Sequence, residues 1–456
     1  MRASVNDKTF SLFEKNRAGW LYSLLLISAL AGPGISYSYL YLFHPVWVLS
    51  LAALFNNQTL IRETWRNKPT RLHYLFFAGT LAWFAVEIIW AANKTYALKH
   101  LFYIMAGWSL SFILILKNNK EDQLKLTLRI LFIMISVEMA VSVLEMTGIF
   151  RWPVSKLSDT VSFFGRKNEL QYIVTSKEIG EYIKTVPTGF HWNSNNLCTF
   201  LSLVFPFFLL HKKIWISILW SLLIVTIIVA ASARANYLAV TVITISSVFF
   251  ASKSNYITIL AVLIAVAAYS TNGFTFRNGE FSKVNEIQSF SRRILGLPPL
   301  LGKAKTEEPD NSGNIRAELI RNGLEALRKN YGIGLGGGNS KVPQEAKGGV
   351  GVYKITSMHN FWIETLVEGG VLYALAYGIW YCSILWGLFL VFRKSKKENF
   401  RYYASACLLA GGGFIIAAMA PSSVIYFFPM YLFWGICIAI IQIWKRENAD
   451  THSIRY

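Results

Sequence analysis

The sequence predicts an all-α integral membrane protein with about twelve transmembrane helices and a long, partly helical extracytoplasmic loop between the ninth and tenth helices. Of its 456 residues, 54% are hydrophobic and only 15% are charged, and the apolar residues form long runs such as 72–91 and 130–150. A run of about 20 apolar residues spans the hydrocarbon core of a membrane, where only a helix satisfies its backbone hydrogen bonds internally. Abundant Trp, Tyr and Phe are typical of membrane interfaces.

The apolar runs also predict where the helices lie. They are expected near 18–33, 36–55, 72–92, 99–117, 126–150, 195–210, 214–231, 236–251, 256–270, 360–392, 403–420 and 423–444. The first run ends in Ala31-Gly32-Pro33-Gly34, which is a turn signal more than a cleavage site, so the first helix is expected to be retained. We find no internal repeat, and residues 1–456 are predicted to form one membrane domain.

The short segments between the predicted helices differ in charge. Those on one side of the membrane, at 56–71, 117–125, 211–213, 253 and 393–397, all contain Lys or Arg. Those on the other side contain only Lys94 and Arg234. The positive-inside rule therefore predicts that the first set and both termini are cytoplasmic. The two long segments, 151–192 and 271–358, then become extracytoplasmic loops, and loops of that length are exempt from the rule.

Composition also excludes several functions. The net charge of +20 could suggest nucleic acid, but the basic residues lie mostly in short links between apolar runs, so no nucleic-acid partner is expected. The four cysteines lie within apolar runs without a CxxC pair, which supports neither a disulfide framework nor a zinc site. The aspartates are scattered and no His-Glu-x-x-His occurs, so no metal or other cofactor is expected.

Residues 314–331 are predicted to form an amphipathic helix inside the larger loop, because their apolar and charged residues separate onto two faces. Arg321 belongs to the charged face, where Arg321 with Glu325 and Glu325 with Lys329 form expected pairs four residues apart. Arg316 instead projects from the middle of the apolar face. It either snorkels to water at the start of the helix or points into a cavity toward an anion.

A second candidate is Arg234, in the stretch Ser232-Ala233-Arg234-Ala235-Asn236-Tyr237 between the seventh and eighth helices. This arginine breaks the charge asymmetry of its side of the membrane. A guanidinium is permanently charged and its fork fits phosphate oxygens, so a phosphate ligand is one interpretation. Contact with lipid headgroups is the other.

Two further segments carry polar residues at predicted helix entries. His359 lies where the large loop re-enters the membrane, followed by Asn360 and by Glu364 and Glu368 on one helix face. The histidine could act as a general base or simply cap the helix, and acidic residues inside a membrane are functional candidates. The sixth helix begins with Asn193, Asn195 and Asn196, which could cap the helix or bind sugar hydroxyls.

Two other patterns are ambiguous. The stretch Gly332-Ile333-Gly334-Leu335-Gly336-Gly337-Gly338 is glycine-rich like a phosphate-binding loop, but no Gly-Lys-Ser/Thr ending follows, so a helix stop and turn explain it equally well. Glu138 and Glu145, seven residues apart in the fifth helix, share a face. They could be packing partners or line a cavity.

In order along the chain, the Asn-rich entry, the Arg234 stretch, the Arg316 helix with its glycine-rich end, and residues 359–370 resemble the O-antigen ligase/polymerase superfamily. The resemblance covers mainly residues 189–372. The chain departs from the family in lacking the proline that often precedes the glycine-rich stretch, and in having His191-Trp192 where smaller residues are usual.

The resemblance implies a metal-independent glycosyltransferase of cell-envelope or lipopolysaccharide biosynthesis, in the bacterial inner (cytoplasmic) membrane with a periplasmic active site. Its donor would be an undecaprenyl-diphosphate-linked glycan. A polymerase passes that glycan to another lipid-linked repeat unit, and a ligase passes it to lipid A-core. The Asn-rich entry favours the polymerase; a lipid-linked oligosaccharide flippase is disfavoured because the arginines lie at one face and no repeat is evident.

Specific roles follow from the resemblance. Arg234 and Arg316 are expected to hold the donor diphosphate, and His359 to activate or orient the acceptor hydroxyl. The expected substrate-binding residues are Asn193, Asn195, Asn196, Arg321, Asn360 and Glu364.

Overall fold

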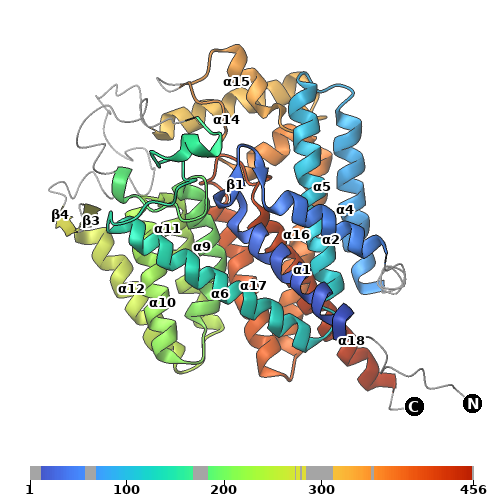
Figure 1. Ribbon diagram of the computed structural model, residues 1–456, viewed down its shortest axis with the longest axis vertical. Helices are drawn as coiled ribbons and strands as arrows, with labels where there is room; N and C mark the ends of the chain where they lie inside the picture. The colour runs from blue at the N-terminus through green and yellow to red at the C-terminus, as the bar shows by residue number, and fades with distance from the viewer. Residues whose placement is uncertain are drawn as a thin grey trace, which may run out of the picture.

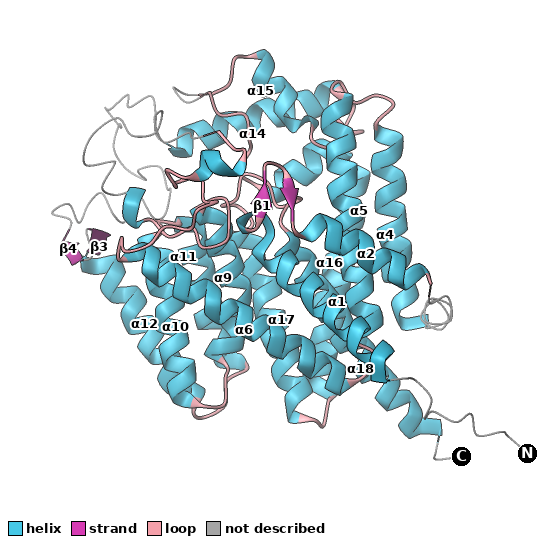
Figure 2. Cartoon of the chain, in the orientation of Figure 1, coloured by secondary structure: helices cyan, strands magenta, loops and turns pink. Residues whose placement is uncertain are grey.

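The computed structural model of the chain describes residues 12–56, 68–167, 183–272, 274–277, 280–283, 312–350 and 354–453. Helices make up most of this part of the chain (Figure 2). Each predicted apolar run overlaps one helix, although the ends differ by several residues. These helices are α1 (Leu12–Ala31), α2 (Phe43–Phe55), α4 (Lys68–Glu87), α5 (Lys94–Lys117), α6 (Glu121–Met146), α9 (Ser194–Leu209), α10 (Ile214–Ala230), α11 (Arg234–Ser246), α12 (Asn255–Asn272), α16 (Phe361–Lys394), α17 (Glu398–Ala417) and α18 (Phe428–Ser453).

Five helices in the described part of the chain are long and apolar enough to cross a membrane: α5, α6, α16, α17 and the part of α18 at Phe428–Asn448. Six further segments are apolar but shorter: Gly19–Gly34, Phe43–Phe55, Ser194–Leu209, Ile214–Ala230, Arg234–Phe249 and Asn255–Ser270. The all-α membrane class is therefore supported, and the number of crossings stays a prediction. In Figure 1, α1 begins and α18 ends away from the end of the bundle where α14 and α15 lie.

The helix α18 lies at the centre of the bundle, and 89% of its most apolar 18-residue stretch is buried. Trp434 of α18 is fully buried and contacts Trp380 of α16, with ring centroids 5.7 Å apart. Ser111 of α5 donates a hydrogen bond of 2.7 Å to the Tyr431 carbonyl. A helix that is apolar on all sides has to be buried against neighbours or lipid, which explains this central position.

The predicted helix at 36–55 is wrong in its first part. Residues Ser36–Tyr37 (β1) and Leu40–Tyr41 (β2) form a short antiparallel hairpin, and helix α2 begins only at Phe43. Ser38 adopts a positive φ of 53° in the turn. Hydropathy does not separate a short strand from a helix, whereas tyrosines favour strands. A second hairpin, β3 (Phe274–Arg277) with β4 (Glu280–Lys283), lies in the large loop.

The amphipathic helix predicted in the large loop is confirmed as α14 (Ser312–Lys329). Its apolar face buries Ile315 and Leu319, which pack against Val350. The short helix α15 (Val342–Ala346) lies beside it, where Asn322 Nδ2 donates to Gln344 Oε1 at 3.0 Å. These two helices lie across one end of the bundle (Figure 1).

The helix α16 is kinked at Gly370, whose φ of 77° and ψ of 176° are not helical. At this kink the glycine-rich segment after α14 runs alongside α16. The Leu335 N–H donates to the Val367 carbonyl at 2.9 Å, and the Val371 N–H donates to the Gly332 carbonyl at 2.9 Å. The kink frees the α16 backbone for these bonds, so the large loop is fastened to the helix that follows His359.

Gly370→Ala should lower the stability of the protein by about 3 kcal/mol, because this φ/ψ region is almost exclusive to glycine and a Cβ would overlap the Ile333 carbonyl. The measurement is the thermal unfolding midpoint in detergent. Gly378→Ala in the same helix is the matched control, since nothing lies within 4 Å of its Cβ position. Equal midpoints for the two variants would contradict this role of Gly370.

Candidate functional site

Arg234 is the first residue of α11 and is exposed. The residues that follow it fasten the helix to its neighbours. Asn236 is buried and its Nδ2 donates to Thr199 Oγ1 at 3.1 Å, on α9. The Tyr237 hydroxyl donates to the Val266 carbonyl of α12 at 2.6 Å. The motif therefore divides into two anchoring residues and one arginine held at the start of a well-packed helix.

Arg316 lies on α14 near the start of the helix and is half-buried. Arg321 is exposed, and five residues of helix turn it about 140° away from Arg316. Glu325 pairs with Lys329 at 2.8 Å, which confirms one of its two expected i,i+4 pairs. Arg316 and Arg321 therefore lie on different faces of α14, as the periodicity of the helix predicts.

His359 is half-buried, with a positive φ of 50° just before α16. Its Nδ1 lies 3.3 Å from the Ala420 carbonyl, in the turn after α17. The neighbouring backbone is fixed to the same turn, because the Phe361 N–H donates to the Ala418 carbonyl at 3.1 Å. His359 is not the helix cap. Asn360 has that role, and its Oδ1 accepts the N–H of Trp362 at 3.1 Å and of Ile363 at 3.2 Å.

Four basic groups are linked by mutual electrostatic repulsion, and we call them the basic cluster: Arg234, Arg316, His359 and Lys156. Burial lowers the pKa of the Arg316 guanidinium, and the positive charge of Arg234 lowers it further. Burial also lowers the pKa of His359, as do the charges of Arg316 and Lys156, while the hydrogen bond to Ala420 acts in the opposite direction. Crowded like charges make the cluster attractive to an anion, which would relieve their repulsion.

Lys156 was missed by the sequence analysis, because a single lysine in a long loop carries no pattern. It belongs to the first long loop, and a buried carboxylate organises that loop. Glu145, at the end of α6, is fully buried. Its Oε2 accepts the N–H of Thr188 at 2.6 Å and of Gly189 at 2.7 Å, and its Oε1 accepts the N–H of Trp152 at 3.0 Å.

Glu138 lies on the same face of α6, seven residues before Glu145, and has a related role. It is buried, and its Oε1 accepts the Phe190 N–H at 2.9 Å. Together Glu138 and Glu145 fix residues 152 and 188–190 to the end of α6. The two ends of the first loop are therefore held next to each other at the end of α6. These hydrogen bonds support the interpretation of Glu138 and Glu145 as packing partners over the interpretation that they line a cavity.

The asparagines at the start of α9 differ in their engagement. Asn193 is the N-cap, and its Oδ1 accepts the Asn196 N–H at 2.9 Å. Asn195 and Asn196 are half-buried, and the Asn196 Oδ1 has no hydrogen-bond partner among the described residues. Glu364 is buried in the first turn of α16, where its Oε2 likewise has no partner among them.

The glycine-rich segment does not form a phosphate cradle in this conformation, because Leu335 and Gly336 donate their N–H groups to α16 carbonyls. Within the described residues, no group of three or more His, Cys, Asp or Glu side chains is placed to hold a metal ion. Independence from metals stays a prediction.

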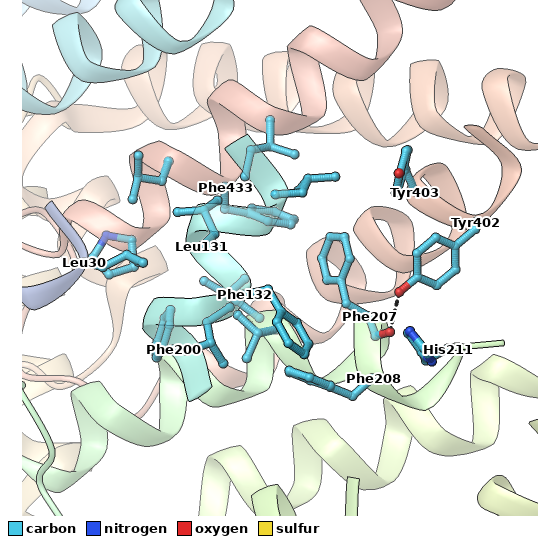
Figure 3. A pocket seen from close by; sticks show the side chains of 17 residues that line it. Leu30, Leu131, Phe132, Phe200, Phe207, Phe208, His211, Tyr402, Tyr403 and Phe433 are labelled. Atoms are coloured by element: carbon cyan, nitrogen blue, oxygen red, sulfur yellow. Dashed lines mark hydrogen bonds between the residues drawn. The ribbon is translucent and has the colours of Figure 1, made fainter. Parts of the chain in front are cut away.

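A cavity of about 180 Å³ lies elsewhere in the bundle, among α1, α6, α9, α17 and α18 (Figure 3). Its walls are almost entirely apolar, including Phe132, Phe207, Phe208 and Phe433. The Tyr402 hydroxyl, at its edge, donates to the Phe207 carbonyl at 2.5 Å. The first half of α17 lines the cavity, whereas His359 contacts the turn that follows the last residue of α17. It is separate from the basic cluster.

The rate at which diethyl pyrocarbonate modifies His359 can be followed by mass spectrometry as the pH is varied. The midpoint of this pH dependence should lie below about 6.5, the normal pKa of imidazole, because only the neutral ring reacts. Arg316→Ala should raise that midpoint, since it removes a charge that disfavours the protonated ring. Arg328→Ala, which removes an exposed charge from the same helix, should leave it unchanged. Identical midpoints in the wild type and Arg316→Ala would argue against the basic cluster.

Two comparisons show which known proteins this chain resembles. Residues 218–378 match the family model described as O-antigen ligase, a range that includes Arg234, Arg316 and His359. The chain is also 23% identical over 455 residues to the teichuronic acid biosynthesis protein TuaE of Bacillus subtilis (strain 168), which covers 96% of this chain and 80% of that protein. Together with the helical fold, these matches support a multi-pass membrane protein with a polysaccharide polymerase or ligase type of function. Both matches support the assignment of the chain to the O-antigen ligase/polymerase superfamily.

Proposed function

We propose that this protein is a metal-independent glycosyltransferase that polymerises undecaprenyl-diphosphate-linked repeat units of a surface polysaccharide on the extracytoplasmic face of the membrane. The observation that carries the proposal is the basic cluster: the charges of Arg316 and Lys156 act on His359, and the charge of Arg234 acts on Arg316. Such a cluster suits a diphosphate, whose negative charge rises as it leaves. The relative named for teichuronic acid biosynthesis supports polymer assembly.

The proposed reaction breaks the bond between the donor sugar's anomeric carbon and the diphosphate oxygen. A hydroxyl oxygen of the acceptor forms the new bond to that carbon, and the lipid diphosphate leaves with the electron pair. Arg234 and Arg316 stabilise the charge on the departing diphosphate, which needs no metal ion. Lys156 adds a third positive charge.

His359 receives the proton of the acceptor hydroxyl in this scheme. The Ala420 carbonyl, 3.3 Å from Nδ1, accepts a hydrogen bond when Nδ1 carries the proton, and this leaves the Nε2 lone pair for the acceptor. The lowered pKa of His359 keeps the ring neutral at physiological pH, as a general base requires. The proton then passes to water.

The remaining predicted residues have more limited roles in the proposal. Asn195 and Asn196 at the entry of α9 are the best placed to bind sugar hydroxyls, because Asn193 and Asn360 use their side-chain oxygens as helix caps. Glu364 stays a candidate inside the start of α16. Arg321 is exposed away from Arg316 and would reach only the outer part of a glycan.

Two alternatives remain. An O-antigen ligase acting on lipid A-core would use the same cluster with a different acceptor, and the family description favours it as the second candidate. A flippase for lipid-linked oligosaccharides would need basic residues along a path through the membrane. The cluster lies at one end of the bundle, and the cavity in the bundle is apolar, so transport is the weakest of the three.

Arg234→Ala and His359→Ala should each abolish glycan transfer, with a fall of about 100-fold or more, while the protein still inserts into the membrane. The measurement is the glycan pattern of a deletion strain that carries each variant. Loss of chain length with one repeat unit still attached indicates a polymerase, whereas full-length glycan left on the carrier indicates a ligase. Arg328→Ala, on the exposed face of α14, is the control and should behave as the wild type. Full activity of both test variants would exclude the proposed site.

Lys156→Ala should reduce the transfer rate about tenfold, because it removes one of three charges that face the diphosphate. Lys156→Arg should retain most of the rate. Lys167→Ala removes an exposed charge from the same loop and should have no effect. The rates are measured with lipid-linked repeat units in reconstituted membranes. A Lys156→Ala rate equal to that of Lys167→Ala would remove Lys156 from the proposed site.

A further inference from the structure

Glu368 is a buried carboxylate, only 1% exposed, that the proposed reaction does not use. It lies on α16, nine residues after His359, and is surrounded by groups from two other parts of the chain. Its Oε1 accepts the Ser340 hydroxyl at 2.5 Å and the Ser340 N–H at 3.4 Å. Its Oε2 lies 3.2 Å from His100 Nδ1 on α5. Glu368 thereby joins α16 and α5 to Ser340, which lies two residues after the glycine-rich stretch.

The backbone around Glu368 is paired with the same segment. The Gly336 N–H donates to the Glu368 carbonyl at 3.0 Å. Two tryptophans, in α4 and just after it, bind both sides of this junction. Trp83 Nε1 donates to the Gly369 carbonyl of α16 at 2.9 Å, and Trp90 Nε1 donates to the Gly334 carbonyl of the glycine-rich segment at 3.1 Å. A Cβ on Gly334 would overlap the Glu368 carbonyl, so glycine is required for this approach.

The glycine-rich segment is also the direct continuation of α14, which carries Arg316. His359 stands at the start of α16, on the other side of the same junction. A small apolar group of Leu327, Met358 and Val367 seals the space between the two helices. Any movement of the segment along α16 would therefore move Arg316 relative to His359.

We propose that Glu368 is a positioning residue: by binding Ser340 and His100 it locks the glycine-rich segment onto α16 and so fixes the spacing between Arg316 and His359. This inference rests on the proposed function. A carboxylate is suited to the task because its two oxygens bind the two partners separately, one on the loop and one on α5. Backbone hydrogen bonds hold the glycine-rich segment against residues 367–371 of α16, and the Glu368 side chain adds directional bonds to Ser340 and to α5.

The test compares Glu368→Gln with Glu368→Ala. Glutamine keeps an oxygen for the Ser340 hydroxyl and offers an amide N–H to His100 Nδ1, so it should retain a rate within about threefold of the wild type. Alanine loses both bonds and should reduce the transfer rate about tenfold or more, because small displacements of reacting groups have large effects on rate. Rates are measured with lipid-linked repeat units in reconstituted membranes.

A distance measurement separates positioning from simple loss of fold. Spin labels are placed at Glu318→Cys on α14 and Leu372→Cys on α16, both exposed, in a Cys382→Ser background; the other three cysteines are buried. The wild type and Glu368→Gln should give a narrow distance distribution, and Glu368→Ala a broad one. If Glu368→Ala does not fold, Ser340→Ala removes only the hydroxyl bond and should give a smaller broadening with a smaller loss of rate.

The outcomes are distinct. A narrow distribution or a wild-type rate in folded Glu368→Ala would overturn the proposal, as would a wild-type result for Ser340→Ala where that variant is the one tested. Arg316→Ala serves as the reference, with a narrow distribution and lost transfer. Retained transfer in Arg316→Ala would reject the proposed function instead, whatever the distances in the Glu368 variants show.

Discussion

Buried carboxylates hold together the end of the bundle that carries the basic cluster. Glu145 accepts backbone N–H groups from both ends of the first long loop, Glu138 accepts one more, and Glu368 binds the glycine-rich segment. A buried carboxylate is costly without partners, so each one requires its loop to return to the same place. Segments with little regular structure thus become fixed scaffolding for the site.

The anchoring groups and the proposed reactive groups are different residues. Three anchoring side chains form hydrogen bonds that hold helices in place: Asn236, Tyr237 and Asn360. Arg234 and Arg316 instead interact through like charges. Repulsion between cations destabilises the folded protein, so a rigid surround is needed to hold them in place. In the proposed function, a bound anionic substrate offsets that repulsion.

Several elements were predictable because their signals are local. Long apolar runs identified the segments of the bundle, and helical periodicity identified α14 and the odd position of Arg316. The broken charge rule identified Arg234. The hairpin at Ser36–Tyr41 was missed, since hydropathy carries no information on strand or helix over so few residues. Lys156 was missed because one lysine in a loop has no pattern.

By itself, the sequence determined the helical membrane class, the large loop helix and the short set of residues Arg234, Arg316 and His359. Periodicity and composition encode these features along the chain. The tertiary structure decided which of the polar residues meet: it brought Lys156 in and assigned Glu138, Glu145 and Glu368 to loop anchoring. Such contacts join residues far apart in sequence, and only the packing of the helices brings them within hydrogen-bonding distance.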